Sequence, residues 1–253
     1  MTTDSAPDPV VQTFELTREF DRFVAVKNVS FAVAKGEIFG LIGPNGAGKS
    51  TLMKMLTTML PPSSGRALIA GFDVAREPAQ VRKHIGYMPQ LLSADGELTG
   101  YENLLLSSRL YLIPHEERAV RIEEALHMMG LSEARDRLAR NYSGGMLRRL
   151  EIAQSMLHRP VILFMDEPTE GLDPVGRNLV WDNIRALRRK IGSAVVLCTH
   201  YMEEADQLCD RVAVMRDGRI VAIGTPAELK AAVGPEATLD DVFASLAGAG
   251  QGD

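Results

Sequence analysis

The chain has 253 residues, of which 45% are hydrophobic and 24% charged, as in a globular protein with one large domain or one domain and a subdomain. Its formal net charge of −5 argues against non-specific nucleic-acid binding, and no apolar run approaches the roughly 18–20 residues that a membrane-spanning helix needs. Cys198 and Cys209 have neither metal-site nor disulfide spacing, which favours reduced, cytosolic thiols. Residues 1–10 are acidic, contain prolines and lack the apolar stretch of a secretion signal, so we expect a flexible tail.

Strand patterns come first along the chain. Residues 12–42 contain short stretches in which polar and apolar side chains alternate, as in half-buried strands. The apolar run 38–42 is short enough to be a buried parallel strand. A helix is expected after the next loop and should continue to about Leu60, where Pro61 and Pro62 end it.

The loop between this strand and this helix matches the phosphate-binding pattern G-x-x-x-x-G-K-[ST] without exception. Its residues are Gly43, Pro44, Asn45, Gly46, Ala47, Gly48, Lys49, Ser50 and Thr51. Glycines let consecutive backbone N–H groups turn toward an anion, and the helix N-terminus adds partial positive charge. Lys49 would reach the β- and γ-phosphates, and the Ser50 hydroxyl would bind Mg²⁺. An ordinary glycine-rich turn needs neither side chain, so we predict a site for a nucleoside triphosphate.

The middle of the chain changes character. Short strands and one helix alternate from about Ala67 to Met88, ending in a strand over 85–88. Residues 97–157 are then amphipathic and charged, and residues 116–126 have a helical period. We expect this stretch to be a helical insert.

The alternation of strands and helices resumes at Val161. It predicts a largely parallel α/β sheet with the nucleotide at the carboxyl ends of the strands. Asp217-Gly218 is a strong signal for a hairpin turn. The expected elements are strands over 161–165, 194–198, 211–216 and 219–224 and a helix from about 174 to 190.

Two carboxylates follow the strand over 161–165. Asp166 stands where a Walker B carboxylate belongs and would hold Mg²⁺ directly or through water. Glu167 is one residue further, points the other way and would polarise an attacking water. Alone, such a pair is as often the solvated start of a loop. After a complete phosphate loop, the catalytic interpretation is favoured.

A second glycine-rich segment, Ser143-Gly144-Gly145, opens a helix expected over 147–158. Alone it is a serine N-cap followed by two permissive glycines. Because it stands a short distance before Asp166, the chain here resembles the ATP-binding cassette (ABC) family, whose signature motif has this core ahead of the carboxylate strand. The resemblance implies that Ser143, Gly144 and Gly145 contact ATP.

Further positions match the family in order. Gln90 matches the Q-loop glutamine, Asp173 the D-loop aspartate, which would also contact the nucleotide, and His200 the switch histidine. Alone, Gln90 would be a polar loop residue and His200 a solvated histidine. The resemblance implies that the catalytic residues of hydrolysis are Lys49, Gln90, Glu167 and His200. It also implies that the Mg²⁺ ligands are Ser50, Gln90 and Asp166.

An aromatic side chain for the adenine ring is expected near the end of the first strand. Phe20 fits this family position, with Phe23 as the second choice. Alone, Phe20 would be a core or strand-edge aromatic residue.

The resemblance also implies the domain plan. The fold class is α/β of the P-loop NTPase (RecA-like) type: a core sheet, an antiparallel β subdomain and a helical insert. The boundaries are an ABC ATPase domain over 11–230, with its core over 11–90 and 158–225 and its helical signature subdomain over 97–157, and a short C-terminal helical tail over 231–253.

In this family two cassettes pack head to tail, so that the Lys49 loop of one faces the Ser143 loop of the other across ATP. The pore is a separate permease, which docks on the helical insert and on the loop around Gln90, and the cassette lies at the cytoplasmic face of the membrane. The resemblance therefore implies ATP and Mg²⁺ as cofactors, a permease and a second, identical cassette as partners, and no nucleic acid.

Two segments resemble those of daunorubicin-resistance-type exporters and imply export of a drug, lipid or similar molecule. They are the signature from Tyr142 to Met146 and the segment from Thr238 to Phe243. The signature departs from the common family form, which has leucine first and glutamine last. Glu170 stands where small or apolar residues are frequent, and the sequence offers no reason for it.

Three other functions are weighed against export. A cassette ATPase of translation or DNA repair is expected to carry a second cassette, a long coiled coil or a zinc module. An importer of sugars often has a large regulatory domain, for which the residues after Pro226 are too few. A regulatory module without hydrolysis is disfavoured by Glu167 and His200.

Overall fold

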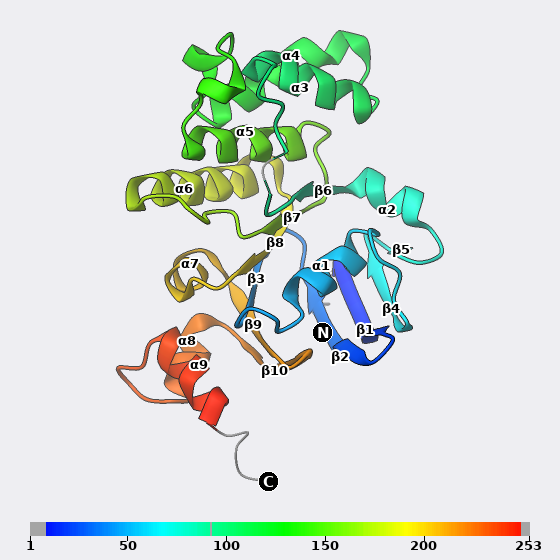
Figure 1. The fold of residues 1–253 in the computed structure, drawn as a ribbon, viewed down its shortest axis with the longest axis vertical. Coiled ribbons are helices and arrows are strands. Elements are labelled where there is room, and N and C mark those ends of the chain that lie inside the picture. Colours follow the sequence, from blue (N-terminus) through cyan, green and yellow to red (C-terminus); the bar gives the residue numbers. More distant parts are fainter. Residues whose placement is uncertain (1–8, 92, 249–253) are drawn as a thin grey trace, which may run out of the picture.

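The computed structural model describes residues 9–91 and 93–248 as an α/β protein with two sheets (Figure 1). The central sheet has six strands in the order β10-β9-β3-β8-β7-β6. Of these, β9 to β6 run parallel to one another, and β10 is antiparallel to β9. The strands are β3 (Ile38–Ile42), β6 (Ile85–Met88), β7 (Ile162–Asp166), β8 (Ala194–Thr199), β9 (Arg211–Arg216) and β10 (Arg219–Gly224).

The central strands β3, β7 and β8 are apolar except for Asp166 and Thr199 at the ends of β7 and β8, because both faces of this sheet are covered. All residues of β3, β7 and β8 are buried. Successive side chains of a strand point to opposite faces. Ile38 and Ile42 accordingly belong to one apolar cluster and Phe39 and Leu41 to another. The sheet thus separates two cores, one under the helical insert and one under the antiparallel sheet.

The antiparallel sheet has the order β2-β1-β4-β5 and is joined to the central sheet by a shared core. Its strands are β1 (Val11–Phe20), β2 (Phe23–Val33), β4 (Ser64–Ile69) and β5 (Phe72–Asp73). Helix α1 (Lys49–Leu56) lies between the two sheets (Figure 1). Its Leu52 and Met55 share a cluster with Leu16 of β1 and Phe39 of β3. This packing fixes the start of α1 against both sheets.

The helical insert stands apart from the sheets at one end of the molecule (Figure 1). Helix α3 begins with a capping box in which Thr99 and Glu102 satisfy each other's backbone N–H groups. Helix α5 packs against α3 and α4 on one side and against α6 on the other. The helices between β5 and β8 are α2 (Pro78–His84), α3 (Gly100–Leu110), α4 (His115–Met128), the 3₁₀ turns η1 (Ser132–Ala134) and η2 (Ala139–Asn141), α5 (Gly144–Met156) and α6 (Pro174–Ile191).

Three short helices complete the described chain: α7 (Met202–Leu208), α8 (Pro226–Ala231) and α9 (Leu239–Gly248). Thr238 caps α9, because its hydroxyl accepts from the Asp241 N–H at 3.2 Å. Leu239 and Val242 are buried in the same cluster as Leu229 of α8. The C-terminal tail therefore packs on its own domain. Residues 249–253 of the expected tail lie outside the described residues.

Three expected boundaries need correction. Helix α1 ends at Leu56 rather than near Leu60, because Thr58 takes a left-handed conformation (φ 63°) and the N–H groups of the next two residues turn back to Lys54. Helix α5 begins at Gly144 rather than at 147, since the cap is Ser143 itself. Val10, placed in the flexible tail, is buried and donates to Val33 O at 2.8 Å; residues 1–8 of that tail lie outside the described residues.

Candidate active site

The phosphate loop runs from the carboxyl end of β3 to the start of α1, and close contacts require glycine at two of its positions. Gly48 has φ 101°, and a Cβ there would lie 2.4 Å from Ala25 O. A Cβ on Gly43 would lie 2.3 Å from Met215 O. Both distances are below any real contact, so neighbouring backbone holds this loop in one shape.

Lys49 is the charged centre of this loop. It is 6% exposed, and its Nζ donates to Gly43 O at 2.7 Å and to Pro44 O at 3.1 Å. The ammonium therefore lies inside the curve of the loop. A cavity of about 280 Å³ opens here and is lined by Phe23, Ala25, Asn45, Gly46, Ala47, Gly48, Lys49, Ser50, Thr51, Gln90 and Glu167.

Asp166 ends β7 beside the first turn of α1. Burial raises its pKa, a side-chain hydrogen bond with Ser50 opposes this, and the charge of Glu167 adds to it. Its Oδ1 is buried and has no hydrogen-bond partner among the described residues. An unpartnered buried carboxylate oxygen next to a hydroxyl fits a hard cation such as Mg²⁺, which in nucleotide sites is bound by one or two carboxylates and by phosphate oxygens.

Glu167 and His200 form a pair at the carboxyl ends of neighbouring strands. Glu167 Oε2 accepts from His200 Nδ1 at 2.9 Å. Its backbone N–H donates to Cys198 O at 2.9 Å, and its φ of 52° is left-handed. Because a carboxylate only accepts, Nδ1 is the ring nitrogen that carries hydrogen. The carboxylate, a candidate general base, is thereby held in one orientation at the cavity wall.

Two residues of the loop after Glu167, Thr169 and Glu170, take part in hydrogen bonds with carboxylates that the sequence did not predict. Thr169 Oγ1 and Trp181 Nε1 both donate to Oε1 of Glu204, at 2.8 and 3.0 Å. Burial raises the pKa of Glu204. Gln90 Nε2 donates to Glu170 Oε2 at 2.9 Å. The only signal in the sequence was Glu170 as an unusual residue at its position; Glu204 has the pattern of a solvated helix residue.

The signature segment lies on a different surface. Ser143 caps α5 by accepting from the Met146 N–H at 3.3 Å, and Ser143 and Gly144 are exposed. Asp173, the exposed cap of α6, accepts from the Gly176 N–H at 2.7 Å. None of these residues lines the Lys49 cavity. The chain therefore brings Lys49 together with Ser50, Gln90, Asp166, Glu167 and His200, and leaves Ser143, Gly144, Gly145 and Asp173 outside that group.

The unusual tyrosine of the signature has a structural role. Tyr142 is buried, and its hydroxyl donates to Ala134 O at 2.7 Å. It also packs so closely on Gly100 that a Cβ there would lie 2.1 Å from the hydroxyl oxygen. Tyr142 thus fastens the start of α5 to α3 and η1.

The two candidate aromatics for adenine are cross-strand partners at the end of the β1–β2 hairpin. Phe23 is 61% exposed and lines the cavity, whereas Phe20 is 42% exposed and does not. The Arg18 guanidinium lies 4.6 Å from the centre of the Phe20 ring. The adenine role of Phe20 stays a prediction.

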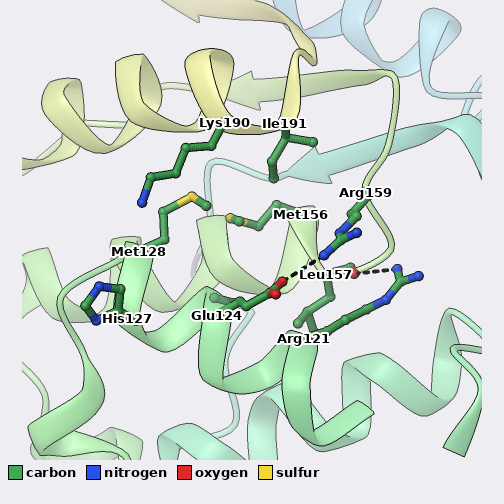
Figure 2. A pocket seen from close by; sticks show the side chains of 10 residues that line it. Arg121, Glu124, His127, Met128, Met156, Leu157, Arg159, Lys190 and Ile191 are labelled. Carbon is green, nitrogen blue, oxygen red and sulfur yellow. Dashed lines mark hydrogen bonds and ion pairs between the residues drawn. The ribbon is translucent and has the colours of Figure 1, made fainter. Parts of the chain in front are cut away.

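A larger cavity, of about 470 Å³, lies between α4, the end of α5 and the end of α6 (Figure 2). Figure 2 shows Met128 and Met156 facing each other across it, with Arg159 reaching Glu124 and Arg121 reaching the Leu157 carbonyl. These contacts measure 2.8 and 3.1 Å. The cavity shares no lining residue with the phosphate-loop cavity. It lies at the boundary between the helical insert and the core of the domain.

Comparisons with known proteins lead to one protein family. A family model described as ABC transporter matches residues 26–170. The daunorubicin/doxorubicin resistance ATP-binding protein DrrA of Streptomyces peucetius is 46% identical over 91% of this chain and 70% of its own length. The linearmycin resistance ATP-binding protein LnrL of Bacillus subtilis is 38% identical over 89% of this chain and 72% of its own length.

Solved structures show the same fold. An ATP-binding subunit of an ABC transporter superposes with a TM-score of 0.83 at 28% identity, covering 94% of this chain and 99% of that one. An ATP-binding cassette in a dimeric post-hydrolysis state, bound to ADP and Pi, gives a TM-score of 0.75 at 26% identity and covers 85% and 98%. The predicted α/β fold class is confirmed.

Proposed function

The chain belongs to the ABC transporter family, and we propose that it is the ATPase subunit of an exporter that acts through a separate membrane permease. As a member of this family it is an ATP-binding ATPase. The observation that carries the proposal is the 46% identity, over 91% of the chain, with a protein named for daunorubicin/doxorubicin resistance.

In this proposal the nucleotide is held by the phosphate loop and by the side chains beside it. Lys49 exchanges its two backbone carbonyl partners for β- and γ-phosphate oxygens, and the loop N–H groups bind the remaining oxygens. An aromatic ring of the β1–β2 hairpin, Phe20 or Phe23, stacks on adenine. Ser50, Asp166 and Gln90 would hold Mg²⁺, which would neutralise phosphate charge.

Hydrolysis needs a base beside the γ-phosphate. Glu167 lines the cavity together with Lys49, so a water between them is within its reach. The Glu167 carboxylate accepts a proton from this water as its oxygen forms a bond to the γ-phosphorus. The bond between the γ-phosphorus and the oxygen that bridges to the β-phosphate breaks, and ADP leaves. His200, donating to Oε2 at 2.9 Å, keeps the carboxylate turned toward that position.

A second copy of the chain completes the site. The exposed N-terminus of α5, capped by Ser143, offers N–H groups and a partial positive charge to the free face of a γ-phosphate. Because Ser143 lies outside the cavity of its own chain, it serves the site of a partner in a head-to-tail homodimer.

The permease docks on the helical insert and on the loop around Gln90. Among the described residues no helix is both long and apolar enough to pass through a bilayer. Large apolar side chains are exposed in this region: Leu91 (82%), Leu106 (44%), Leu110 (73%) and Leu112 (84%). Exposed apolar side chains that gather on one region favour protein contact. This docking places the subunit at the cytoplasmic face of the membrane.

Export is tested in the host of the gene. Deletion should sensitise cells to an amphiphilic drug such as daunorubicin, and the wild-type gene should restore both resistance and efflux. A Glu167→Gln gene should restore neither, because transport requires hydrolysis. Unchanged sensitivity and efflux for a panel of such drugs in the deletion strain would contradict a role in drug export.

A further inference from the structure

The side chains of Gln90 and Glu170 meet although they are 80 residues apart in the chain. Gln90 follows β6 and lines the phosphate-loop cavity, while Glu170 lies in the loop between Glu167 and α6. Gln90 Nε2 donates to Glu170 Oε2 at 2.9 Å. The bond therefore forms while Gln90 still faces the nucleotide cavity.

The backbones of both Gln90 and Glu170 are held by further hydrogen bonds. The backbone carbonyl of Gln90 accepts from Arg148 Nη2 at 2.6 Å, and Arg148 is itself buried against Glu151. On the other side, Glu170 N–H donates to Glu167 O at 3.2 Å, and the adjoining Thr169 is fixed to buried Glu204. The Gln90–Glu170 bond is itself exposed, but it joins two segments whose backbones are held in place.

We propose that Glu170 is a positioning residue that orients the Gln90 amide for cation binding, an inference that rests on the proposed role of Gln90 as a Mg²⁺ ligand. An amide has one oxygen with lone pairs and one NH₂ group, and only the oxygen binds a cation. An ionised carboxylate can only accept hydrogen bonds, so it selects the NH₂ group. Glu170 therefore turns Gln90 Oε1 toward the cation.

Without Glu170 the amide is free to rotate and to present its NH₂ group to the cation. Partners that orient metal ligands typically change metal affinity about 10–100-fold when removed. Because Gln90 is one of several ligands, we expect a loss near the lower end, about tenfold. The negative charge of Glu170 is a competing explanation, since it would attract a cation without acting through Gln90.

A double-mutant cycle on the full chain separates the two explanations. The probe is Mn²⁺, whose binding to the protein with a non-hydrolysable ATP analogue is followed by electron paramagnetic resonance. Glu170→Ala should raise the Kd for Mn²⁺ about tenfold. In a Gln90→Ala background, the same substitution should have no further effect, because the oriented ligand is already gone.

A third variant and a control sharpen the test. Glu170→Gln keeps an acceptor oxygen at the same reach and should lose less affinity than Glu170→Ala. Glu236→Gln removes an exposed carboxylate elsewhere and should change nothing. Equal losses with Glu170→Ala and Glu170→Gln, in both backgrounds, would mean that charge alone acts and would overturn the proposal. So would an unchanged Kd in Glu170→Ala.

The cycle also distinguishes this proposal from the function on which it rests. If Gln90→Ala leaves Mn²⁺ affinity unchanged, Gln90 is not a metal ligand, and both its proposed role and the positioning role of Glu170 are wrong. If Gln90→Ala weakens Mn²⁺ binding but Glu170→Ala does not, the site stands and only the positioning role is wrong. Thermal unfolding of each variant shows whether a change in affinity comes from loss of fold.

Discussion

Glu167 combines a strained backbone with a fixed side chain. Its φ of 52° is unusual for a residue with a Cβ, and such strain is retained where neighbouring structure imposes it. Here the backbone N–H bond to Cys198 and the side-chain bond to His200 impose it from both ends. The result is a carboxylate that needs little rearrangement before it can take a proton.

Replacing this carboxylate tests its role directly. In Glu167→Gln the shape of the side chain is kept but the base is lost, so hydrolysis should fall by about 10²-fold or more. ATP binding should persist, because Lys49 and Ser50 are untouched. The variant should accumulate ATP-bound dimers, seen by size-exclusion chromatography with ATP. Hydrolysis at the wild-type rate would mean that another group activates the water.

At the scale of elements, the loop between β7 and α6 links parts that are distant in sequence. Glu167 binds His200 after β8, Thr169 binds Glu204 on α7, and Glu170 binds Gln90 after β6. A movement of this loop would therefore displace the side chains at the proposed water and metal-ligand positions, as well as the contact with α7.

The anchor on α7 should make stability depend on pH. Burial raises the folded pKa of Glu204 above its ordinary value of 4.5. As pH rises through 4.5, the unfolded chain releases this proton while the folded protein retains it, so the free energy of unfolding falls until the raised pKa is passed. In Glu204→Gln, which still accepts from Thr169 and Trp181, this decline should be absent.

Thermal unfolding from about pH 4 to pH 8 measures this difference. The wild-type Tm minus the Glu204→Gln Tm should decrease with rising pH, while other titrating groups cancel in the subtraction. The same subtraction with exposed Glu236→Gln should not show this decrease. A constant difference for Glu204→Gln would mean that Glu204 is not held protonated in the folded protein.

The tyrosine of the signature gives a second element-scale prediction. Tyr142→Phe removes the bond to Ala134 O but keeps the buried ring, so the free energy of unfolding should fall by about 1 kcal/mol, as measured by urea denaturation. ATP affinity of the monomer should not change, because Tyr142 does not line the cavity. Weaker monomer binding would instead tie this residue to the nucleotide.

The sequence predicted those structural elements that are determined by neighbouring residues in the chain. Asp217-Gly218 defined the β9–β10 hairpin because its two left-handed residues (φ 49° and 78°) are what a tight hairpin turn needs. The end of α1 was misplaced because proline marks only where a helix cannot continue. Here the chain left the helix earlier, at Thr58.

The same division holds for the site. Lys49 and Ser50 were predicted because the phosphate loop is one contiguous motif, and Asp166 because it directly follows an apolar strand. The contacts of Glu170 and Glu204 join segments far apart in the chain, and no periodicity reports such pairings. A buried carboxylate on a short amphipathic helix looks, in sequence, like a solvated one.

For the whole molecule, the central feature is that the two groups of predicted site residues lie on separate surfaces. The Lys49 half is a cavity with a candidate base and metal ligands, and the Ser143 half is an exposed, capped helix N-terminus. One copy cannot bring them together without rearrangement. In the proposed function two copies bring them together head to tail, so this separation predicts an ATP-dependent homodimer.

Ser143→Arg tests the assembly without touching the Lys49 cavity. A bulky cation at the helix N-terminus blocks the approach of the partner's phosphates, so dimerisation and hydrolysis should be lost together. ATP binding to the monomer should survive, as measured by fluorescence of a labelled nucleotide. Ser245→Arg, at an exposed position of α9, is the matched control and should behave as wild type.

Mixing variants gives the sharper result. Lys49→Ala lacks one half-site and Ser143→Arg the other, so neither forms ATP-dependent dimers alone. Together they contain one intact composite site, with Lys49 from one chain and Ser143 from the other, and an ATP-dependent heterodimer should appear on size-exclusion chromatography of the mixture. Coupling between sites can still suppress turnover, which is why binding is the measurement. If Ser143→Arg hydrolyses ATP normally as a monomer, the head-to-tail arrangement is wrong for this chain, because one copy then suffices for catalysis.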